Sequence, residues 1–350
     1  MSDAADPARL DRRRFGAIML SAAAAAPAGR AAAQPPLPVI VAEGGAAEER
    51  IEDTRSALDL AINQGCDFLQ VNLTPSREGA LVARRSSELS QSTDVSIRPE
   101  FADRRSSKVL DGGSVTGWFS EDFTLAELQT LNCREAQPDI RPQNVALNGK
   151  EPVLALSDVL SIARAGCVRA ARTIGVCVAL VRPTYYQGVG LDVVQRLADE
   201  LGSEGYISAA AAIWTQALEP EALAAFAKLS PVRRMLLVGS GQPPDASALA
   251  AAGSVAHAIS AEQDLLISSD ATLSPTPLAG QAHAAGLRVF SRTARGENAF
   301  LPPSLRRGDA PAARGDARKL IAALFAAGVD GLATDIPAEA ARARRSLARS

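Results

Sequence analysis

Two carboxamide side chains, Gln70 and Asn72, stand two residues apart in an otherwise apolar stretch that runs from Gly65 to Leu73. The stretch is typical of a β-strand, and side chains alternate between the two faces of a strand. Gln70 and Asn72 therefore share one face, while leucine and valine side chains share the other. Two interpretations remain open: an edge strand with a solvated face, or a strand end that directs polar groups into a site.

Other residues that could do chemistry are few and scattered. None of the four cysteines has Cys-x-x-Cys spacing, which disfavours a metal or redox centre, and they are Cys66, Cys133, Cys167 and Cys177. Cys66 and Cys177 lie in apolar runs and are predicted to be buried free thiols, although an exported protein could oxidise the four in three different pairings.

The chain has only two histidines. His283 lies near the end of a predicted helix, where a histidine is expected to be a surface or packing residue. His257 follows a turn, in an apolar run with no partner residue indicated. Neither position is typical of a catalytic histidine.

The N-terminus has the order of an export signal. Arginines at 12–14 precede the apolar run 17–26, and Ala31-Ala32-Ala33 offers a cleavage site before Gln34. This pattern predicts a twin-arginine-type signal peptide over residues 1–33 and a periplasmic or secreted protein. A membrane anchor is the alternative, but the apolar run is too short to span a bilayer, and no other stretch is long enough after cleavage.

The remaining chain, residues 34–350, is mildly acidic. Residues 1–33 contain five arginines and three aspartates, which leaves 32 basic and 36 acidic residues, a net charge of about −4. No basic patch is expected from this composition, which argues against a nucleic-acid partner. The length suits a single barrel of repeated strand–helix units.

Strands and helices alternate along this chain. Helical runs end in glycine directly before apolar runs, as at Gly65, Gly202, Gly286 and Gly328, and glycine after a helix is how such turns are built. Thr54 is predicted to cap a helix over 55–63, and Pro220 to begin another. Strands are expected over these ranges: 37–42, 65–73, 173–181, 206–207, 209–214, 235–238, 287–290 and 329–334.

The alternation predicts a parallel sheet closed into a (β/α)₈ TIM barrel, with an open doubly wound sheet as the alternative. No Gly-x-Gly-x-x-Gly motif follows an early strand, which disfavours that alternative. Residues 88 to about 150 are polar and rich in turns, apart from a short helix over 125–131. They are predicted to form an insertion after the second strand that covers the mouth of the barrel.

Several motifs, in order and across most of the chain, resemble the glycerophosphodiester phosphodiesterases, specifically their exported bacterial branch. The similarity runs from about Pro38 to Arg342, and its most specific stretches are 99–104, 115–128, 141–144, 182–186, 297–302 and 333–337. The resemblance implies a TIM barrel that hydrolyses glycerophosphodiesters in lipid and glycerol metabolism. It also implies two histidines as acid and base, Ca²⁺ or Mg²⁺ held by carboxylates, and a lysine and an arginine on the phosphate.

This sequence departs from the family pattern at nearly every one of those positions. The catalytic positions that the resemblance implies carry Glu43, Arg85 and Val181. The implied metal-ligand positions carry Gln70, Asn72 and Ala179, and the implied substrate-binding positions carry Gly44, Arg182 and Arg292. Carboxamides lend only a carbonyl oxygen to a hard cation, so weak or absent Ca²⁺ or Mg²⁺ binding is expected.

Three functions follow as hypotheses. The first is a residual phosphodiesterase that uses Glu43 as base and Arg85 in place of the metal charge. The second is a non-catalytic periplasmic protein that binds a small phosphodiester or polyol phosphate through Arg85, Arg182 and Arg292. The third is a structural, partner-binding protein. In the last two the chain is a pseudoenzyme with no required cofactor.

Overall fold

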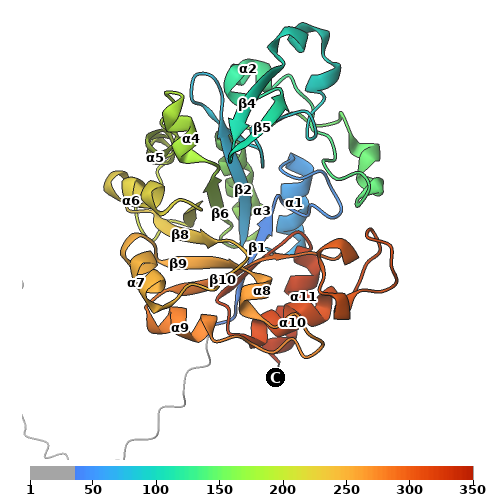
Figure 1. The fold of residues 1–350 in the computed structure, drawn as a ribbon, viewed down its shortest axis with the longest axis vertical. Coiled ribbons are helices and arrows are strands. Elements are labelled where there is room, and N and C mark those ends of the chain that lie inside the picture. The colour runs from blue at the N-terminus through green and yellow to red at the C-terminus, as the bar shows by residue number, and fades with distance from the viewer. Residues whose placement is uncertain (1–35, 350) are drawn as a thin grey trace, which may run out of the picture. The chain divides into compact units, whose positions relative to one another are not determined.

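The computed structural model describes residues 36–349 (Figure 1). Residues 37 onward form one compact unit built on a sheet of parallel strands. Its barrel strands are β1 (Val39–Glu43), β2 (Phe68–Pro75), β6 (Gly175–Leu180), β7 (Ile213–Ala217), β8 (Arg233–Val238), β9 (Ala258–Glu262), β10 (Arg288–Ala294) and β11 (Gly331–Thr334). Strand β1 pairs with both β11 and β2, so the sheet closes, and the predicted TIM barrel is confirmed.

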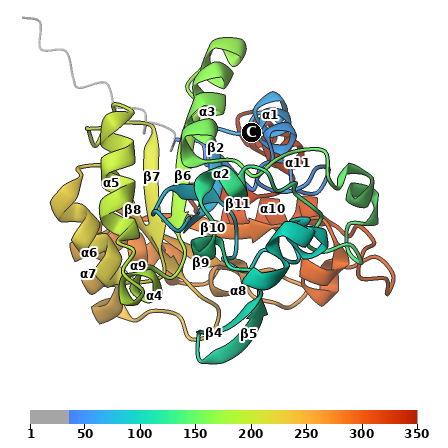
Figure 2. The same cartoon turned by 90° about the horizontal axis from the view of Figure 1, so that it is seen from above.

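Helices follow the strands and cover the outside of the barrel, as Figure 2 shows. They are α1 (Arg55–Gln64), α3 (Leu156–Ala170), α4 (Pro183–Gly188), α5 (Val193–Ser203), α6 (Pro220–Leu229), α7 (Ala246–Val255), α8 (Gln263–Leu266), α9 (Leu278–Ala284), α10 (Ala317–Ala326) and α11 (Pro337–Leu347). The hydroxyl of Thr54 accepts a hydrogen bond from Ala57 N (3.3 Å) and caps α1, as predicted. Gly65 ends α1 in the left-handed conformation, with φ of 98°.

Alternate residues of each strand point into the barrel and fill it. Trp214, Met235 and Phe290 form the interior core with smaller side chains, while the other strand face packs against the helices. Two glycines make room for aromatic rings, because a Cβ at Gly175 would lie 2.2 Å from the ring of Phe68 and one at Gly331 would lie 2.4 Å from Phe290. The barrel interior around these residues is therefore packed and has no room for a ligand.

The segment between β2 and α3, residues 76–155, is called the inserted segment and has its own small core. It contains β3 (Leu81–Ala83), which pairs with β2, then η1 (Val95–Ile97), η2 (Pro99–Arg104), β4 (Ser106–Leu110), β5 (Gly113–Gly117), η3 (Ser120–Asp122), α2 (Leu125–Leu128) and η4 (Pro142–Leu147). Phe101 and Phe123 meet edge to face within that core. The segment lies over one end of the barrel strands (Figure 1).

One strand predicted from the sequence does not form, and one strand of the barrel was not predicted. Residues 206–207 form no strand, because α5 runs on to Ser203 and the left-handed turn falls at Gly205 rather than Gly202. Strand β9 was missed, since its Ala258–Glu262 run is short and has only one β-branched residue, Ile259, beside two alanines. The predicted signal peptide, 1–33, lies outside the described residues. Within residues 36–349, no helix has both the length and the apolarity needed to cross a bilayer.

Candidate functional site at the barrel mouth

The carboxyl ends of the parallel strands bring most of the predicted site residues together. Strand register sets Glu43 of β1 beside Gln70 of β2, and Asn72 beside Ala179 of β6. Gln70 and Asn72 have the same parity as Phe68, whose ring packs with the barrel interior. The polar face of the strand therefore points into the mouth of the barrel, which decides between the two interpretations left open by the sequence.

Gly44 shapes the loop that follows β1. Its φ is +66°, and a Cβ there would lie 2.9 Å from Cβ of Glu52. Its carbonyl accepts a hydrogen bond from Asp53 N (3.0 Å), and its own N–H donates to the carbonyl of Gln70 (2.8 Å). A side chain at position 44 would push Glu52 away from Glu43.

Arg85 joins Glu43, at the end of β1, to Glu52 of the loop that follows it. Its Nη1 lies 3.0 Å from Oε1 of Glu43, and its Nε and Nη2 lie 3.0 and 2.9 Å from Oε2 of Glu52. The guanidinium thus bridges two carboxylates that would otherwise repel each other. Because Glu43 and Arg85 occupy the two implied histidine positions, an ion pair stands where the family would have an acid and a base.

The environment of Glu43 keeps it ionised. Its residue exposure is 7%, and burial alone would raise the pKa of its carboxyl. The opposing charges of Arg85, Arg295 and Arg292, together with a hydrogen bond from the hydroxyl of Thr293, hold that pKa below its ordinary value. A carboxylate in this state is a poor proton acceptor, which disfavours Glu43 as a catalytic base.

Arg84 and Arg85 lie near both Glu52 and Asp53, but the pKa values of these two carboxyls shift in opposite directions. Burial raises the pKa of Glu52, but Arg85 and Arg84 outweigh it and bring the pKa to about 2. Asp53 is 1% exposed, and its Oδ1 has no hydrogen-bond partner. Burial and the neighbouring charge of Glu52 raise the pKa of Asp53 to about 7.

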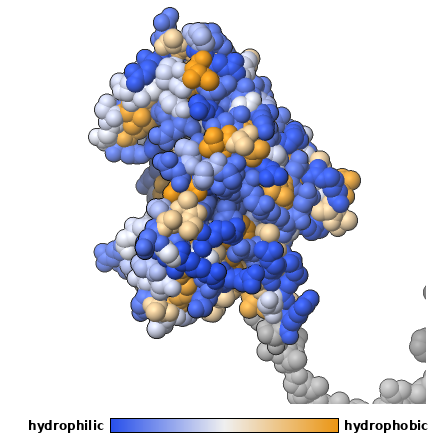
Figure 3. Space-filling model, turned by 90° about the vertical axis from the view of Figure 1, so that its right-hand side faces the viewer, coloured by the Kyte–Doolittle hydropathy of each residue, from blue (hydrophilic) through white to orange (hydrophobic). Residues whose placement is uncertain are grey.

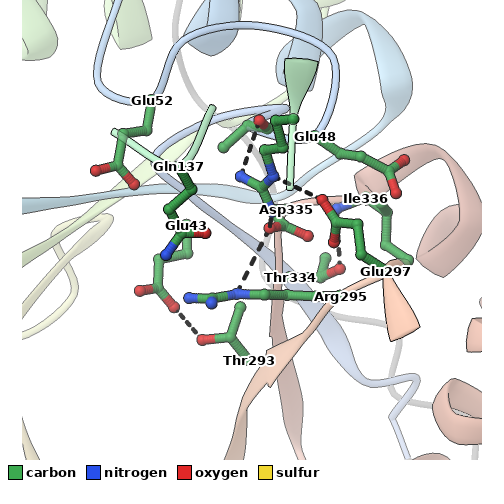
Figure 4. Close-up of polar contacts among 12 residues, drawn as sticks. Glu43, Glu48, Glu52, Gln137, Thr293, Arg295, Glu297, Thr334, Asp335 and Ile336 are labelled. Carbon is green, nitrogen blue, oxygen red and sulfur yellow. Dashed lines mark hydrogen bonds and ion pairs between the residues drawn. The ribbon is translucent and has the colours of Figure 1, made fainter. Parts of the chain in front are cut away.

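A buried ion-pair network ties the inserted segment to the barrel. Nε of Arg141 donates to Oε1 of Glu297 (2.6 Å), Nη1 donates to the carbonyl of Ala47 (2.9 Å), and Nη2 pairs with Asp335. Figure 4 shows Glu297 and Asp335 side by side, with Arg295 reaching Asp335 from the barrel side. These partners come from three separate loops at the carboxyl ends of the strands.

Asn144, three residues after Arg141, completes the attachment. Its side-chain amide donates to the carbonyls of Ala47 and Arg50, each at 3.2 Å, and to Oε2 of Glu135 at 2.9 Å. Helix η4 is thereby fixed to the loop after β1.

A cavity of about 420 Å³ lies between the inserted segment and the mouth. Its lining is mixed in charge, with three arginines, three glutamates and several neutral polar side chains: Arg85, Arg141, Arg295, Glu52, Glu88, Glu135, Ser86, Gln91, Ser92 and Gln137 among others. This volume lies within the usual range for small-molecule sites. The lining offers both hydrogen-bond donors and acceptors, so it suits a polar ligand that carries charge and hydroxyl groups.

The predicted arginines do not line this cavity together. Arg85 lines it, but Arg292 forms an ion pair with Glu262 at 3.0 Å, inside the barrel end. Arg182 turns to Asp111 at the tip of the β4–β5 hairpin, with Nη2 at 2.6 Å from Oδ2. Val181 directly follows β6 and is half-buried.

Four further residues lie at this site without having been predicted from the sequence: Arg141, Arg295, Glu297 and Asp335. Three of them lie in motifs that carry the family resemblance, at 141–144, 297–302 and 333–337. Their place in these motifs could have indicated them, since a family-like motif without catalytic residues can hold the loops of the site together. The histidines lie elsewhere: His283 Nε2 is 2.9 Å from Asp330, and His257 Nδ1 accepts from Arg234 N.

The donors at the implied metal positions do not fit Ca²⁺ or Mg²⁺. Gln70, Asn72 and Ala179 supply no negative charge, and the nearby carboxylate of Glu43 already contacts Arg85 and Thr293. Within residues 36–349, no cluster of three or more His, Cys, Asp or Glu side chains is arranged to hold a metal. The cysteines in that range are all free thiols, and Cys66 and Cys177 are buried as predicted.

Comparison with known proteins gives a consistent family. A model described as the glycerophosphoryl diester phosphodiesterase family matches residues 44–339. Glycerophosphodiester phosphodiesterase GDPD6 of Arabidopsis thaliana is 34% identical over 148 residues, which is 42% of this chain and 38% of that protein. GDPDL3 of the same plant is 28% identical over 55% of this chain and 25% of its own length. The chain thus spans well under half the length of these relatives.

Solved structures share the fold. A glycerophosphodiester phosphodiesterase from Agrobacterium tumefaciens superposes with a TM-score of 0.57 at 17% identity, over 87% of this chain and all of that one. An Oleispira antarctica phosphodiesterase, solved with sn-glycerol-3-phosphate, gives 0.58 at 16% identity, over 88% of this chain and 96% of that one. At such identities the likeness concerns the fold.

The raised pKa of Asp53 predicts a pH-dependent stability. Between pH about 4 and about 7 the folded chain holds a proton on Asp53 that the unfolded chain has lost, so stability falls as pH rises through this window. Asp53→Asn keeps the side-chain shape and suits the left-handed φ of 59°. We expect it to reduce the fall by roughly 1–4 kcal/mol, as measured by urea unfolding at several pH values.

Asp59→Asn, on the half-exposed face of α1, is the control and should keep the slope of the unmodified chain. Equal slopes for the unmodified chain and Asp53→Asn would contradict the assignment.

Loss of Arg141 should destabilise the chain strongly. Arg141→Met leaves Glu297 and Asp335 buried without their main cation, and breaking such a pair typically costs about 3–5 kcal/mol. Arg98→Met removes a more exposed ion pair with Asp94 and should cost about 1 kcal/mol or less. Urea unfolding measures both, and limited proteolysis should cleave the Arg141→Met variant first near residues 136–150. Similar losses for both variants would count against the role of the network.

Proposed function

Because the chain belongs to the glycerophosphoryl diester phosphodiesterase family, we propose that it binds a small phosphodiester or polyol phosphate at the barrel mouth without hydrolysing it. The observation that carries this proposal is the ion pair between Arg85 and Glu43. Hydrolysis in the family, as the resemblance implies, needs two imidazoles at these positions and a cation held by carboxylates. Here the two positions neutralise each other, and the donors beside them are carboxamides.

Neither remaining group replaces that chemistry. Arg85 is held as a cation because the charge of Glu52 raises its pKa well above the ordinary value, so it cannot exchange a proton near neutral pH. Glu43 is held as a carboxylate, and a leaving alkoxide would need a proton that it does not carry. Neither Glu43 nor Arg85 therefore supplies the acid that the residual phosphodiesterase considered from the sequence would need.

The cavity offers the features that binding requires. Arg85 is 42% exposed at its side chain, so its charge is accessible to a phosphate although both neighbouring carboxylates contact it. Arg295 also lines the cavity, stacked 4.4 Å from the ring centroid of Phe300, which presents its guanidinium in a fixed plane. Gln91 and Gln137 can exchange hydrogen bonds with hydroxyl groups of a polyol. With the predicted export signal, this chemistry describes an exported binding protein.

Titration calorimetry with glycerol 3-phosphate and glycerophosphocholine tests the proposal. The unmodified chain should bind at least one of them, and Arg295→Met should weaken binding about 10- to 100-fold through loss of a charged hydrogen bond. Arg196→Met, which removes a surface arginine on α5, is the matched control and should bind normally. Absence of binding to both compounds, or equal binding by the Arg295→Met variant, would overturn the proposed ligand class.

Restoring charge should restore a metal site. The unmodified chain is expected to show no thermal shift with Ca²⁺ or Mg²⁺ and no metal-dependent hydrolysis of glycerophosphocholine. The combined substitutions Gln70→Glu, Asn72→Asp and Ala179→Glu place carboxylates on neighbouring strands of the mouth, because Asn72 and Ala179 pair in register. That variant should gain a Ca²⁺- or Mg²⁺-dependent rise in melting temperature.

The control is Glu43→Gln in the unmodified chain, which should gain no metal response. Metal-dependent turnover by the unmodified chain would refute the absence of hydrolysis while leaving the ligand class intact.

A further inference from the structure

A second large depression lies away from the barrel mouth, between α10 and α11. This α10–α11 groove has a volume of about 950 Å³. Its floor is partly apolar, with Ala322, Phe325, Ala343 and Leu347, and its basic rim includes Arg307, Arg314, Arg318 and Lys319. A smaller depression of about 320 Å³ adjoins it through Arg318, Ala343 and Ser346, and adds Arg342, Arg345 and Arg349.

No basic patch was expected from the composition, and the structure corrects that expectation. Two segments far apart in the chain, 307–319 and 342–349, present seven arginines and lysines to one surface. The acidic residues along the same two depressions are Asp316 and Glu339. This surface is therefore cationic on a chain whose overall charge is −2. Figure 3 shows mainly hydrophilic residues on this side of the molecule, with small apolar areas between them.

The two acidic residues of the groove already contact basic residues or the end of a helix. Glu339 pairs with Arg314 at 2.6 Å, and Arg314 also pairs with Glu48. Asp316 caps α10 through Lys319 N and lies 3.6 Å from Arg307.

The five other cations of this surface have no such partner. Within residues 36–349, the ion pairs of the structure involve none of their side chains: Arg318, Lys319, Arg342, Arg345 and Arg349.

Helix stability does not explain this arrangement. Arg345, near the end of α11, faces the negative end of its helix dipole, where a cation is favourable. Arg318 and Lys319 stand in the first turn of α10, where the dipole disfavours a cation. Arg342 and Arg345 are three residues apart and share one face of α11, and Arg349, just beyond the end of the helix, lines the same depression. The positive charge is thus concentrated on one surface, although two of its cations are unfavourable for the stability of α10.

We propose that the α10–α11 groove is a docking site for the anionic surface of a phospholipid membrane. Phosphate groups would contact the arginine and lysine rim, and the apolar floor at Phe325 and Leu347 would accept the adjoining glycerol and acyl region. Phe325 is buried, with 7% exposure, and Leu347 is 42% exposed, so the groove offers little accessible apolar surface and suits peripheral contact rather than insertion. Charge complementarity carries the choice of an anionic lipid over a neutral one.

Vesicle flotation tests this site with the full chain. Vesicles that contain phosphatidylglycerol should retain the chain, pure phosphatidylcholine vesicles should retain less, and added salt should weaken the anionic binding. The triple variant Arg318→Gln, Arg342→Gln and Arg345→Gln should bind phosphatidylglycerol vesicles about 100-fold more weakly, as three membrane-surface cations predict. All variants carry the same residues 1–33, so the difference reports on the groove.

A matched triple variant keeps the change in net charge and leaves the groove intact: Arg55→Gln, Arg77→Gln and Arg134→Gln. It should bind anionic vesicles like the unmodified chain, and thermal melting should show that both triple variants are folded.

Two results would overturn the proposal. One is an equal loss of vesicle binding in both triple variants. The other is retention of the chain by duplex DNA or polyphosphate, lost in the groove triple variant, without preference for anionic vesicles, which would assign the surface to a soluble polyanion. Either result leaves the ligand binding proposed for the barrel mouth untouched, since no variant of that cavity is used.

Discussion

The architecture of the barrel mouth depends on the contacts that the buried side chain of Arg141 makes. It contacts Glu297 and Asp335, which follow β10 and β11, and the carbonyl of Ala47 in the loop after β1. A barrel alone presents separate loops at the carboxyl ends of its strands. One guanidinium with its donors in a fixed plane joins three of those loops to the inserted segment, and the cavity exists because the segment is held there.

The second constraint is charge balance inside the mouth. Removing histidines and metal carboxylates from such a site could leave uncompensated charge or an empty space. Here Arg85 contacts both Glu43 and Glu52, and the neighbouring side chains of Gln70 and Asn72 carry no charge. The cavity lining is polar, with equal numbers of arginines and glutamates, so the buried charges of the mouth have partners of opposite sign. The site is thus organised as a structure in its own right.

Much of the fold was predictable because it depends on local patterns. Thr54 capped its helix, Pro220 began another, and glycines ended helices before strands, since these effects act within a few residues. The errors had local causes too. Strand β9 is short and alanine-rich, and Gly205 rather than Gly202 forms the turn after α5. Which of two nearby glycines adopts a left-handed conformation is set by how far the helix packs against the barrel.

The sequence by itself determined the barrel and the uncharged side chains at Gln70, Asn72 and Ala179, because strand alternation and residue identity need no knowledge of distant contacts. Only the tertiary structure decided the partners. Arg141 meets residues 156 and 194 positions away, Arg182 turns to a hairpin tip instead of the mouth, and two distant segments build one cationic groove. Side-chain pairing at such separations follows from how the strands close and the insertion docks, and a linear pattern does not contain that information.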